Sequence, residues 1–274
     1  MNIENYGIIA KYYDGAYSAK AGVNLQDVRF YLEQAQQHRG PILEIACGTG
    51  RILLEIARMG TEVVGLDVSA DMLSILRTKL SAESKAVQQR VSVYEGDMRS
   101  FSLGRTFKQV FIPFRPLQHL YTIDDQISAL HCAKAHLQPD GLLTLNVFYP
   151  NFRMLDEVME TEVLDAEWVD PANPQRTIRR YFVRHRVHRL QQYFEGEFIF
   201  RTYQEKQLIA EERSPITMSY YTYPHMLLLF KYCGLDIVEA YGSFAKEPID
   251  ICQEMIFVLR PIALEAGHAP SWRT

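Results

Sequence analysis

The sequence has no long apolar run: no stretch approaches the roughly 20 apolar residues that a helix needs to cross a bilayer. Its beginning, MNIENYGIIAKYYDGAY, lacks the charged and then apolar order of a signal peptide. Both absences argue against secretion and against a membrane partner. We therefore expect a cytoplasmic protein.

Cysteine and basic residues are also scarce. The four cysteines, Cys47, Cys132, Cys233 and Cys252, are widely spread without a C-x-x-C pair, so neither a disulfide framework nor a zinc site is suggested and no metal is expected. The 29 lysines and arginines stand against 33 aspartates and glutamates, for a net charge of -4. A general nucleic-acid binder normally carries a basic surplus, so we expect no nucleic-acid partner.

The chain does have enough apolar residues for a large core, 47% of its 274 residues. From residue 41 to about 149, short apolar runs alternate with amphipathic stretches, which is typical of βαβ units in a parallel sheet. The expected strands are 42–46, 62–67, 91–95, 110–114 and 142–148, and the expected helices lie near 51–59, 70–80 and 125–137. Ser69 and Asp124 are candidate caps of the last two helices, and Pro139 and Gly141 should end the third.

After Pro150 the pattern changes to long alternations of apolar and polar residues, typical of antiparallel strands with one solvated face. A hairpin that turns near Leu190 and Gln191 would pair opposite charges and bury apolar side chains at once. The expected cross-strand neighbours are Arg186 with Glu195, Arg184 with Glu197, and Val183 with Phe198. Neither turn residue is a favoured turn former, so a loop longer by two residues is the alternative. On this register the arginines of 176–189 are solvated partners of glutamates and not a phosphate patch.

The chain then returns to helix and strand patterns. TYPHMLLLFKYCG predicts a helix with Pro224 in its first turn, and 235–240 and 255–259 follow as strands. The antiparallel segment is therefore an insertion before the last two strands. The expected division is a main domain of 1–150 and 221–262, an inserted lid of 151–220, and a tail of 263–274.

Two glycines interrupt PILEIACGTGRILLEIA, residues 41–57, between a strand-like and a helix-like run. Backbone N–H groups at such a turn can approach a ligand closely. The dinucleotide fingerprint fails because Leu53 stands where a third small residue is needed, and no Gly-Lys-Ser/Thr follows for a P-loop. A nicotinamide oxidoreductase is therefore the less favoured alternative.

The string from Glu44 to Gly50 resembles the first motif of class I S-adenosylmethionine-dependent methyltransferases, in which an acidic residue precedes a Gly-x-Gly turn. VVGLDVSADML is similar to that family's second strand, YEGDMRSF to its third-strand loop, FIPFRPLQHL to its fourth strand and AKAHLQPDGLLTLNVF to its fifth. The resemblance implies an α/β fold: a Rossmann-like, mostly parallel seven-stranded sheet with helices on both faces, plus the inserted antiparallel β lid.

The resemblance also implies S-adenosyl-L-methionine as cofactor, with S-adenosyl-L-homocysteine as product. Asp67 would bind both ribose hydroxyls, since a charged acceptor makes the stronger hydrogen bonds. Asp97 would meet the adenine amino group, and Met72 and Met98 would lie near the ring. The other implied cofactor-binding residues are Glu44, Ala46, Cys47, Gly48, Gly50, Val68, Gly96 and Phe114. Cys47 is expected to be a small buried residue, not a nucleophile.

Two further features refine the resemblance. Lys108 stands where many members carry an acid before the fourth strand, a position that supports the loop and leaves catalysis unaffected. AKYYDGAYSAKAG resembles the lid segment of small-molecule N-methyltransferases, including sugar-amine dimethyltransferases and glycine-type enzymes. By that likeness Tyr17 and Lys20 would close over the methionine end of the cofactor. A packing helix with surface tyrosines is the alternative.

Polar residues after the fourth and fifth strands are candidates for an acceptor pocket. They are Arg115, Gln118, His119, Asn146 and Tyr149. Arg115 and His119 are the catalytic candidates, because they follow the fourth strand and His119 could accept a proton near neutral pH. A positioning role for His119, or a satisfied structural histidine, is the alternative.

The sequence thus predicts methyl transfer from S-adenosylmethionine to a small-molecule acceptor, an amine or a hydroxyl, by an enzyme of class EC 2.1.1. A non-catalytic cofactor-binding module is the alternative, because no indispensable catalytic residue identifies an active member. The sequence leaves open the acceptor and the oligomeric state, a homodimer included.

Overall fold

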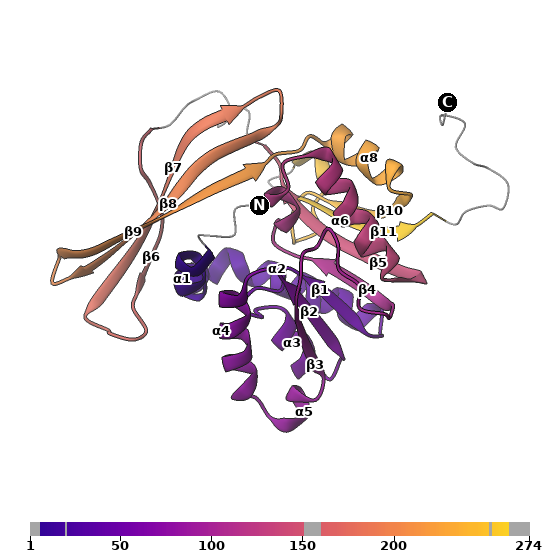
Figure 1. Cartoon of the computed structure of the whole chain (residues 1–274), viewed down its shortest axis with the longest axis horizontal. Coiled ribbons are helices and arrows are strands. Elements are labelled where there is room, and N and C mark those ends of the chain that lie inside the picture. The colour runs from indigo at the N-terminus through magenta and orange to yellow at the C-terminus, as the bar shows by residue number, and fades with distance from the viewer. Residues whose placement is uncertain (1–5, 20, 151–159, 252–253, 263–274) are drawn as a thin grey trace.

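The main part of the molecule is a twisted sheet with helices on both faces, and a second sheet projects from it (Figure 1). The structure, a computed structural model, describes residues 6–19, 21–150, 160–251 and 254–262. Within these ranges, every helix is too short or too polar to traverse a bilayer.

The main sheet has seven strands in the order β10-β11-β5-β4-β1-β2-β3. The strands are β1 (Ile42–Ile45), β2 (Val63–Asp67), β3 (Val91–Glu95), β4 (Phe107–Ile112), β5 (Leu137–Phe148), β10 (Leu235–Tyr241) and β11 (Glu254–Pro261). Neighbouring strands run parallel except that β11 is antiparallel to both β5 and β10. The predicted seven-stranded, mostly parallel sheet is therefore confirmed.

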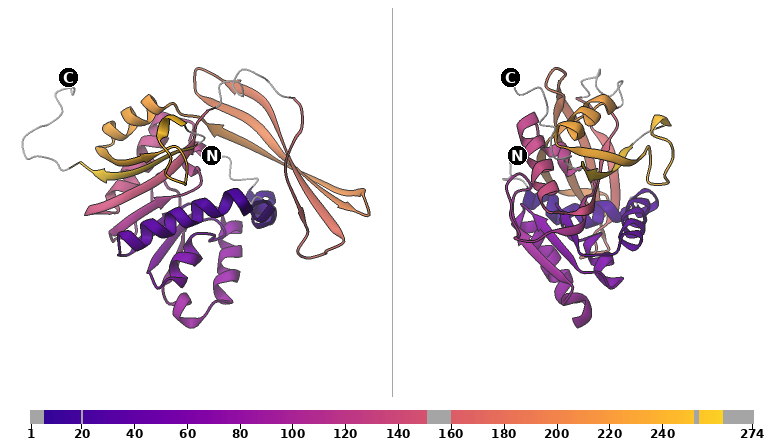
Figure 2. Two further views of the ribbon diagram at one scale, coloured as in Figure 1. Left: turned by 180° about the vertical axis from the view of Figure 1, so that it is seen from behind. Right: turned by 90° about the vertical axis from the view of Figure 1, so that its right-hand side faces the viewer.

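Helices cover both faces of the main sheet (Figure 2). One face carries α2 (Ala21–Gln37), α3 (Leu53–Arg58), α4 (Ala70–Ser81) and α5 (Lys85–Gln88), and the other carries α6 (Ile123–Ala135) and α8 (Tyr223–Tyr232). Ile42 of β1 belongs to the same core cluster as Leu73 of α4, whereas the next residue, Leu43, clusters with Leu130 of α6. Successive strand residues point to opposite faces, so apolar runs such as β1 supply both cores.

The predicted cap residue of helix α4 is confirmed, but the predicted cap residue of helix α6 is not. Ser69 caps α4 as predicted, because its hydroxyl accepts a hydrogen bond from the Met72 N–H. The prediction for α6 is wrong: the hydroxyl of Thr122 accepts from the Asp125 N–H at 3.1 Å, and Asp124 lies inside the first turn. The helix begins at Ile123, so the residue before it takes the cap.

The predicted end of α6 at Pro139 and Gly141 is also wrong. The helix ends at Ala135, and both residues lie in β5, which begins at Leu137. Pairing with β4 is interrupted across the Pro-Asp-Gly sequence, since Phe107 pairs with Leu137 and the next pair is Gln109 with Leu142. Lys108, which stands in the position where an acid is common, pairs there with the Asp140 carboxylate at 2.6 Å.

The second sheet, called the lid sheet below, has four antiparallel strands in the order β6-β7-β8-β9. They are β6 (Val163–Val169), β7 (Arg176–His188), β8 (Tyr193–Gln204) and β9 (Gln207–Ser219). Its far end extends well beyond the main part, as both views show (Figures 1 and 2). The lid sheet confirms the antiparallel insertion expected between the fifth strand and the last two.

The register of β7 and β8 agrees with the prediction only near the turn. The strands are joined by residues 189–192, the longer of the two expected loops, and Arg186 lies opposite Glu195 as predicted. A bulge between Arg184 and Arg186 shifts the remaining pairs by one residue, so that Arg184 pairs with Gly196 and Val183 with Glu197. The interpretation of all these arginines as solvated is therefore wrong, because Arg184 is only 3% exposed.

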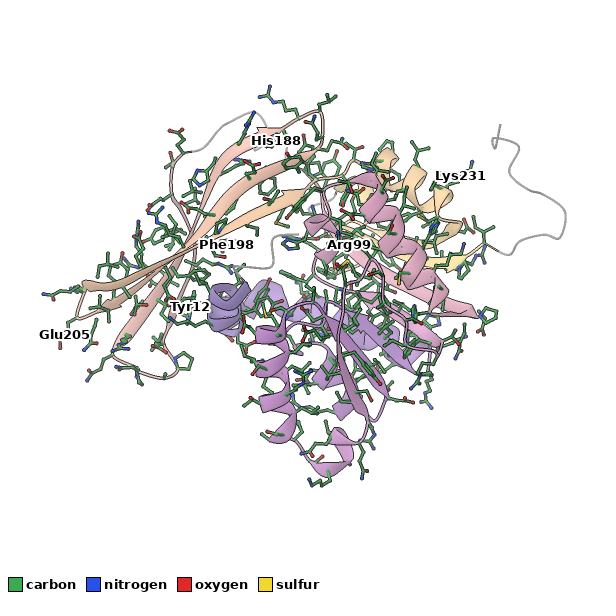
Figure 3. The ribbon with its side chains drawn as sticks, in the orientation of Figure 1. Tyr12, Arg99, His188, Phe198, Glu205 and Lys231 are labelled. Atoms are coloured by element: carbon green, nitrogen blue, oxygen red, sulfur yellow. The ribbon has the colours of Figure 1, made fainter. Side chains whose placement is uncertain are left out.

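Helix α1 (Tyr6–Ala19) lies against the lid sheet (Figure 3). The Tyr12 ring stacks on that of Phe200 with centroids 4.5 Å apart, and Lys11 Nζ lies 2.6 Å from a carboxylate oxygen of Glu212. We call the face that carries Phe200 and Ile178 the inner face, because both cluster with Tyr12. The lid sheet therefore rests on α1 through its inner face.

Candidate active site

A cavity of about 830 Å³ lies at the carboxyl ends of the parallel strands and under the inner face of the lid sheet. Most of the predicted site residues line it: Tyr17, Ala46, Gly48, Asp67, Val68, Met72, Gly96, Asp97, Met98, Phe114, Arg115 and His119. Glu44, Cys47 and Gly50 lie outside its lining, and Lys20 is outside the described residues. The fold thus brings residues from four loops and α1 to one space.

The glycine turn after β1 uses its two glycines differently. Gly48 has a φ of 54°, and a Cβ there would meet no atom within 4 Å, so this position opens toward the cavity. Gly50 has a φ of 82°, and a Cβ there would lie 2.3 Å from the Leu76 side chain. Gly50 is therefore needed for packing against α4, and its predicted contact with the cofactor stays a prediction.

Asp67, the last residue of β2, is tied to the glycine turn. Its Oδ2 accepts a hydrogen bond from the Gly48 N–H at 2.8 Å, and its Oδ1 accepts one from the Ser69 N–H at 2.9 Å. Burial raises the pKa of Asp67, and these backbone donors oppose that rise. The side chain thus presents a fixed carboxylate at the edge of the cavity.

Glu44 and Cys47 lie behind the turn. Glu44 is buried in β1, and burial raises the pKa of its carboxyl to about 8, although the positive charge of Arg51 opposes the shift. Cys47 is buried, as expected, and burial raises the pKa of its thiol. A protonated thiol is a poor nucleophile, so Cys47 has a packing role.

Asp97 follows β3 and is held by an arginine that the sequence did not single out. Arg99 bonds to Asp97 at 2.6 Å and to Asp125 at 2.9 Å. The hydrogen bond from Arg99 lowers the pKa of Asp97. The neighbouring Met98 is buried and lines the cavity, as does Met72 of α4. This side of the cavity therefore combines the apolar side chains of Met98 and Met72 with the ionised carboxylate of Asp97.

The loop after β4 holds two consecutive left-handed residues, Phe114 with a φ of 66° and Arg115 with a φ of 72°. Such conformations are strained for residues other than glycine and persist only where the surroundings impose them. Asn146 of β5 does so: its Oδ1 accepts from the Phe114 N–H at 2.8 Å, and its Nδ2 donates to Glu254 at 3.0 Å. Glu254 in turn accepts a hydrogen bond from Arg115.

Three of the predicted acceptor-pocket residues lie outside the cavity lining. The Asn146 and Gln118 side chains are buried. Gln118 donates a hydrogen bond to the Ser219 carbonyl at 2.7 Å and accepts one from the Phe148 N–H at 2.9 Å. Tyr149 is partly buried against the core. The prediction for these residues is therefore wrong; Asn146 and Gln118 shape the loop from behind.

His119 does line the cavity, at the end of the short 3₁₀ helix Pro116–His119. Burial lowers the pKa of His119 to about 4, and a hydrogen bond to the backbone of Thr217 in β9 opposes the shift. The imidazole is therefore neutral at physiological pH. It can donate or accept one hydrogen bond at each nitrogen but is a weak proton acceptor.

Residues 42–141 match the family model described as a methyltransferase domain. The matched region runs from β1 into β5. A curated relative from Streptomyces fradiae, named dTDP-3-amino-3,6-dideoxy-alpha-D-glucopyranose N,N-dimethyltransferase, is 33% identical over 146 residues, which cover 52% of this chain and 54% of the relative. The chain thus spans about half the length of the curated relatives it matches.

Solved structures match over more of the chain. A SAM-bound amino pentose methyltransferase from Micromonospora echinaspora matches with a TM-score of 0.69 at 21% identity, covering 90% of this chain and 95% of that one. A methyltransferase from Streptomyces caelestis matches with a TM-score of 0.68 at 23% identity, covering 87% and 90%. These likenesses confirm the predicted Rossmann-like fold.

The main part of the molecule also holds a buried ion pair that no sequence pattern indicated. Arg51, directly after the glycine turn, donates to both carboxylate oxygens of Asp27 in α2 at 2.9 and 2.5 Å. The guanidinium lies 5.2 Å from the Tyr17 ring centroid and 5.4 Å from that of Phe114. An acidic residue 24 positions upstream gives no local signal, so only the fold reveals this pair.

Helix α1 is attached to the glycine turn and to α4 by a second polar contact. The Thr49 hydroxyl, inside the glycine turn, donates to Asp14 at 2.7 Å, and Lys79 of α4 pairs with Asp14 at 2.6 Å. On the same helix Tyr17 packs edge-on against Phe114, with centroids 4.7 Å apart. Tyr17 therefore closes the cavity next to the strained loop.

Proposed function

We propose that this chain is an S-adenosylmethionine-dependent methyltransferase that acts on a small-molecule amine. The observation that supports this most is the shared cavity: the glycine turn and Asp67 line one end, and His119 and the lid sheet line the other. A methyl donor and its acceptor must meet in one water-poor space in a fixed orientation, because much of the rate of such a displacement comes from positioning.

The residues of the first end fit the cofactor. Gly48 leaves room beside the turn, and the Asp67 carboxylate is a suitable acceptor for two vicinal hydroxyls. Met72 and Met98 offer polarizable apolar walls for a flat ring, and Asp97 lies next to Met98 as an acceptor for an amino group. When bound, the cofactor supplies an electrophilic methyl group on a sulfonium.

The residues of the other end orient the acceptor and exclude water. Tyr17 and Phe114 form an aromatic wall, and Arg115 and His119 add polar groups beside it. Above about pH 4 the His119 imidazole is neutral and accepts a further proton only weakly, so it positions the acceptor by hydrogen bonding. The amine must therefore reach the site in its neutral form.

The relatives support an amine carried by a sugar as the acceptor. Two curated relatives are named as N,N-dimethyltransferases of dTDP-linked amino sugars. Their similarity covers about half of each chain, so for this protein an amino-sugar acceptor is part of the proposal. In the proposed mechanism, the main domain of 1–150 and 221–262 binds the cofactor and the insert of 151–220 shapes the acceptor end.

Two measurements test the proposal. Calorimetry with S-adenosylmethionine, S-adenosylhomocysteine and NAD should show binding of the first two and none of the third. Mass spectrometry of an amino-sugar panel incubated with protein and S-adenosylmethionine should show the mass gain of one or two methyl groups. Cofactor binding without any methylated product would favour the non-catalytic module, and NAD binding alone would overturn the proposal.

A further inference from the structure

An ion pair lies on the inner face of the lid sheet, inside the cavity. Arg180 of β7 contacts Asp165 of β6 through Nε at 2.6 Å and Nη2 at 2.5 Å, both to the same carboxylate oxygen. Both residues line the cavity together with Phe198, whose ring centroid lies 4.7 Å from the Arg180 guanidinium. Figure 3 shows Phe198 near the junction of the lid sheet and α1, far from the tip at Glu205. The pair therefore faces the acceptor end.

A β-bulge aims Asp165 into the cavity. The pairing of β6 with β7 shifts between Leu164, opposite Tyr181, and Ala166, opposite Arg180, so Asp165 is the extra residue. In a regular strand a side chain beside Ala166 would point to the outer face. Bulges re-aim side chains and are common beside active sites. The irregularity thus brings the carboxylate to Arg180.

A comparison with a neighbouring pair shows how unusual this placement is. Arg179 and Glu167, on the outer face of the same two strands, also form an ion pair, with side-chain exposures of 41% and 45%. For Arg180 and Asp165 the values are 12% and 26%. Removing charges from water is unfavourable, and apolar residues at such positions are often at least as stabilising. Stability alone therefore gives little reason for the inner pair.

We propose that Asp165 and Arg180 form an acceptor subsite that binds a hydroxyl group next to the reacting amine and so determines acceptor specificity. A hydroxyl both donates and accepts hydrogen bonds, and this pair presents a carboxylate acceptor beside a guanidinium with five N–H donors. A ligand group with a full charge would meet a like charge within the pair. The inference rests on the proposed function, since it refines the acceptor of the same site.

Further contacts place the subsite beside the reacting end. The positive charge of Arg180 opposes the burial-driven rise in the pKa of Tyr17, so the two side chains share one electrostatic environment. Tyr17 packs on Phe114, which follows β4 in the strained loop. An acceptor held by Asp165 and Arg180 therefore spans from the lid sheet to the aromatic wall.

The test compares inner-face variants with matched outer-face controls. Asp165→Asn and Arg180→Met remove one partner each, and Glu167→Gln and Arg179→Met make the same changes on the outer face. The probes are 3-amino-3-deoxy-D-glucose, whose amine is flanked by hydroxyls, and cyclohexylamine, which has none. Affinity for the protein loaded with S-adenosylhomocysteine is measured by calorimetry, with KM and kcat measured in methyl transfer.

We expect each inner-face variant to weaken binding of the hydroxylated amine roughly ten- to hundredfold, to raise its KM more than it lowers kcat, and to leave cyclohexylamine within about threefold. Cofactor affinity and both outer-face controls should stay unchanged. Equal effects of inner and outer variants, or no preference of the wild type for the hydroxylated amine, would overturn the subsite. Failure of the wild type to bind the cofactor would instead overturn the proposed function.

Discussion

The two ends of the cavity are built in different ways. At the cofactor end, residues that follow consecutive strands contact one another, as Gly48 and Asp67 do across 19 positions of the chain. At the acceptor end, the loop that carries His119 is held by contacts with the lid sheet, and Gln118 bonds to Ser219, 101 positions away. The first end depends on the main sheet with α1 and α4, and the second depends on an insertion.

This difference indicates that cofactor binding and acceptor binding can change independently. The glycine turn, Asp67 and Met98 lie on the main sheet, whereas Arg180 and Phe198 belong to the lid sheet. Changes in the lid sheet can therefore alter the acceptor without disturbing the cofactor end. The predictions below test how far this independence extends.

The largest effect should follow from removing the lid sheet. We expect replacement of residues 162–217 by a short Gly/Ser linker to leave cofactor affinity within a few fold and to lower turnover by more than about 10³, because positioning is lost. Calorimetry with S-adenosylhomocysteine and single-turnover methyl transfer would measure the two properties. Shortening only the tip around Glu205 is the control. A folded truncation that no longer binds cofactor would show that the two ends are not independent.

Asp67→Ala should have the next largest effect, confined to the cofactor end. Loss of hydrogen bonds between a charged acceptor and two ribose hydroxyls should weaken cofactor binding by about 10- to 100-fold. Isothermal titration with S-adenosylmethionine would measure it, and Asp71→Ala, an exposed carboxylate on the neighbouring α4, is the control. Unchanged affinity in a folded Asp67→Ala variant would remove Asp67 from the cofactor site.

Asn146→Ala tests the junction between the two ends. The variant leaves the Phe114 N–H and a Glu254 oxygen without their partner, which should lower the free energy of unfolding by about 2 to 4 kcal/mol. We expect kcat to fall about tenfold with cofactor affinity retained, because the strained loop relaxes. Urea unfolding and single-turnover rates would measure both. Tyr31→Phe is the control, since it removes only the bond from the Tyr31 hydroxyl to Asn146; an equal loss of kcat in both variants would contradict the loop argument.

His119→Gln should have the smallest effect on turnover. A glutamine can still hydrogen-bond the acceptor, so we expect less than a tenfold loss at pH 7 and the same pH profile as the wild type. The pH dependence of single-turnover methyl transfer in both proteins would decide. Loss of an acidic limb near pH 6.5, together with most of the rate, would establish His119 as a general base.

The same variant should also change the acid stability. His119 has a pKa of about 4 when folded and about 6.5 when unfolded, so between these values the unfolded state binds more protons. The stability of the wild type should therefore fall as the pH drops from 6.5 to 4, by up to about 3 kcal/mol. His119→Gln should remove that part of the pH dependence, as urea titrations at pH 7, 5.5 and 4.5 would show.

The cofactor end could be predicted from the sequence because its signals are local. A strand run followed by glycines, or a strand that ends in Asp67, indicates both the element and the edge where its last residue lies. The seven strands follow from the same apolar runs. Even here Gly50 shows a limit, since its contact with Leu76 depends on how α4 packs.

The acceptor end could be predicted only in outline. The alternation of apolar and polar residues indicated antiparallel strands. The bulges at Asp165 and between Arg184 and Arg186 have no local sequence signal, and each bulge changes which side chains face inward. Gln118 follows β4 and Asn146 lies near the end of β5, as binding residues do, yet their partners come from distant parts of the chain. Polar residues at a strand end thus show where a site is, but not which of them face it.

Helix α1 also has a consequence for synthesis on the ribosome. Its Lys11 pairs with Glu212, 201 positions later, so the helix emerges long before its partner strand has been made. Until β8 and β9 are synthesised, Tyr12 has no Phe200 to stack on and Lys11 has no Glu212 to pair with, and contacts between such distant segments form slowly. Helix α1 therefore docks long after it has been made, and the cavity closes only once β9 has been synthesised.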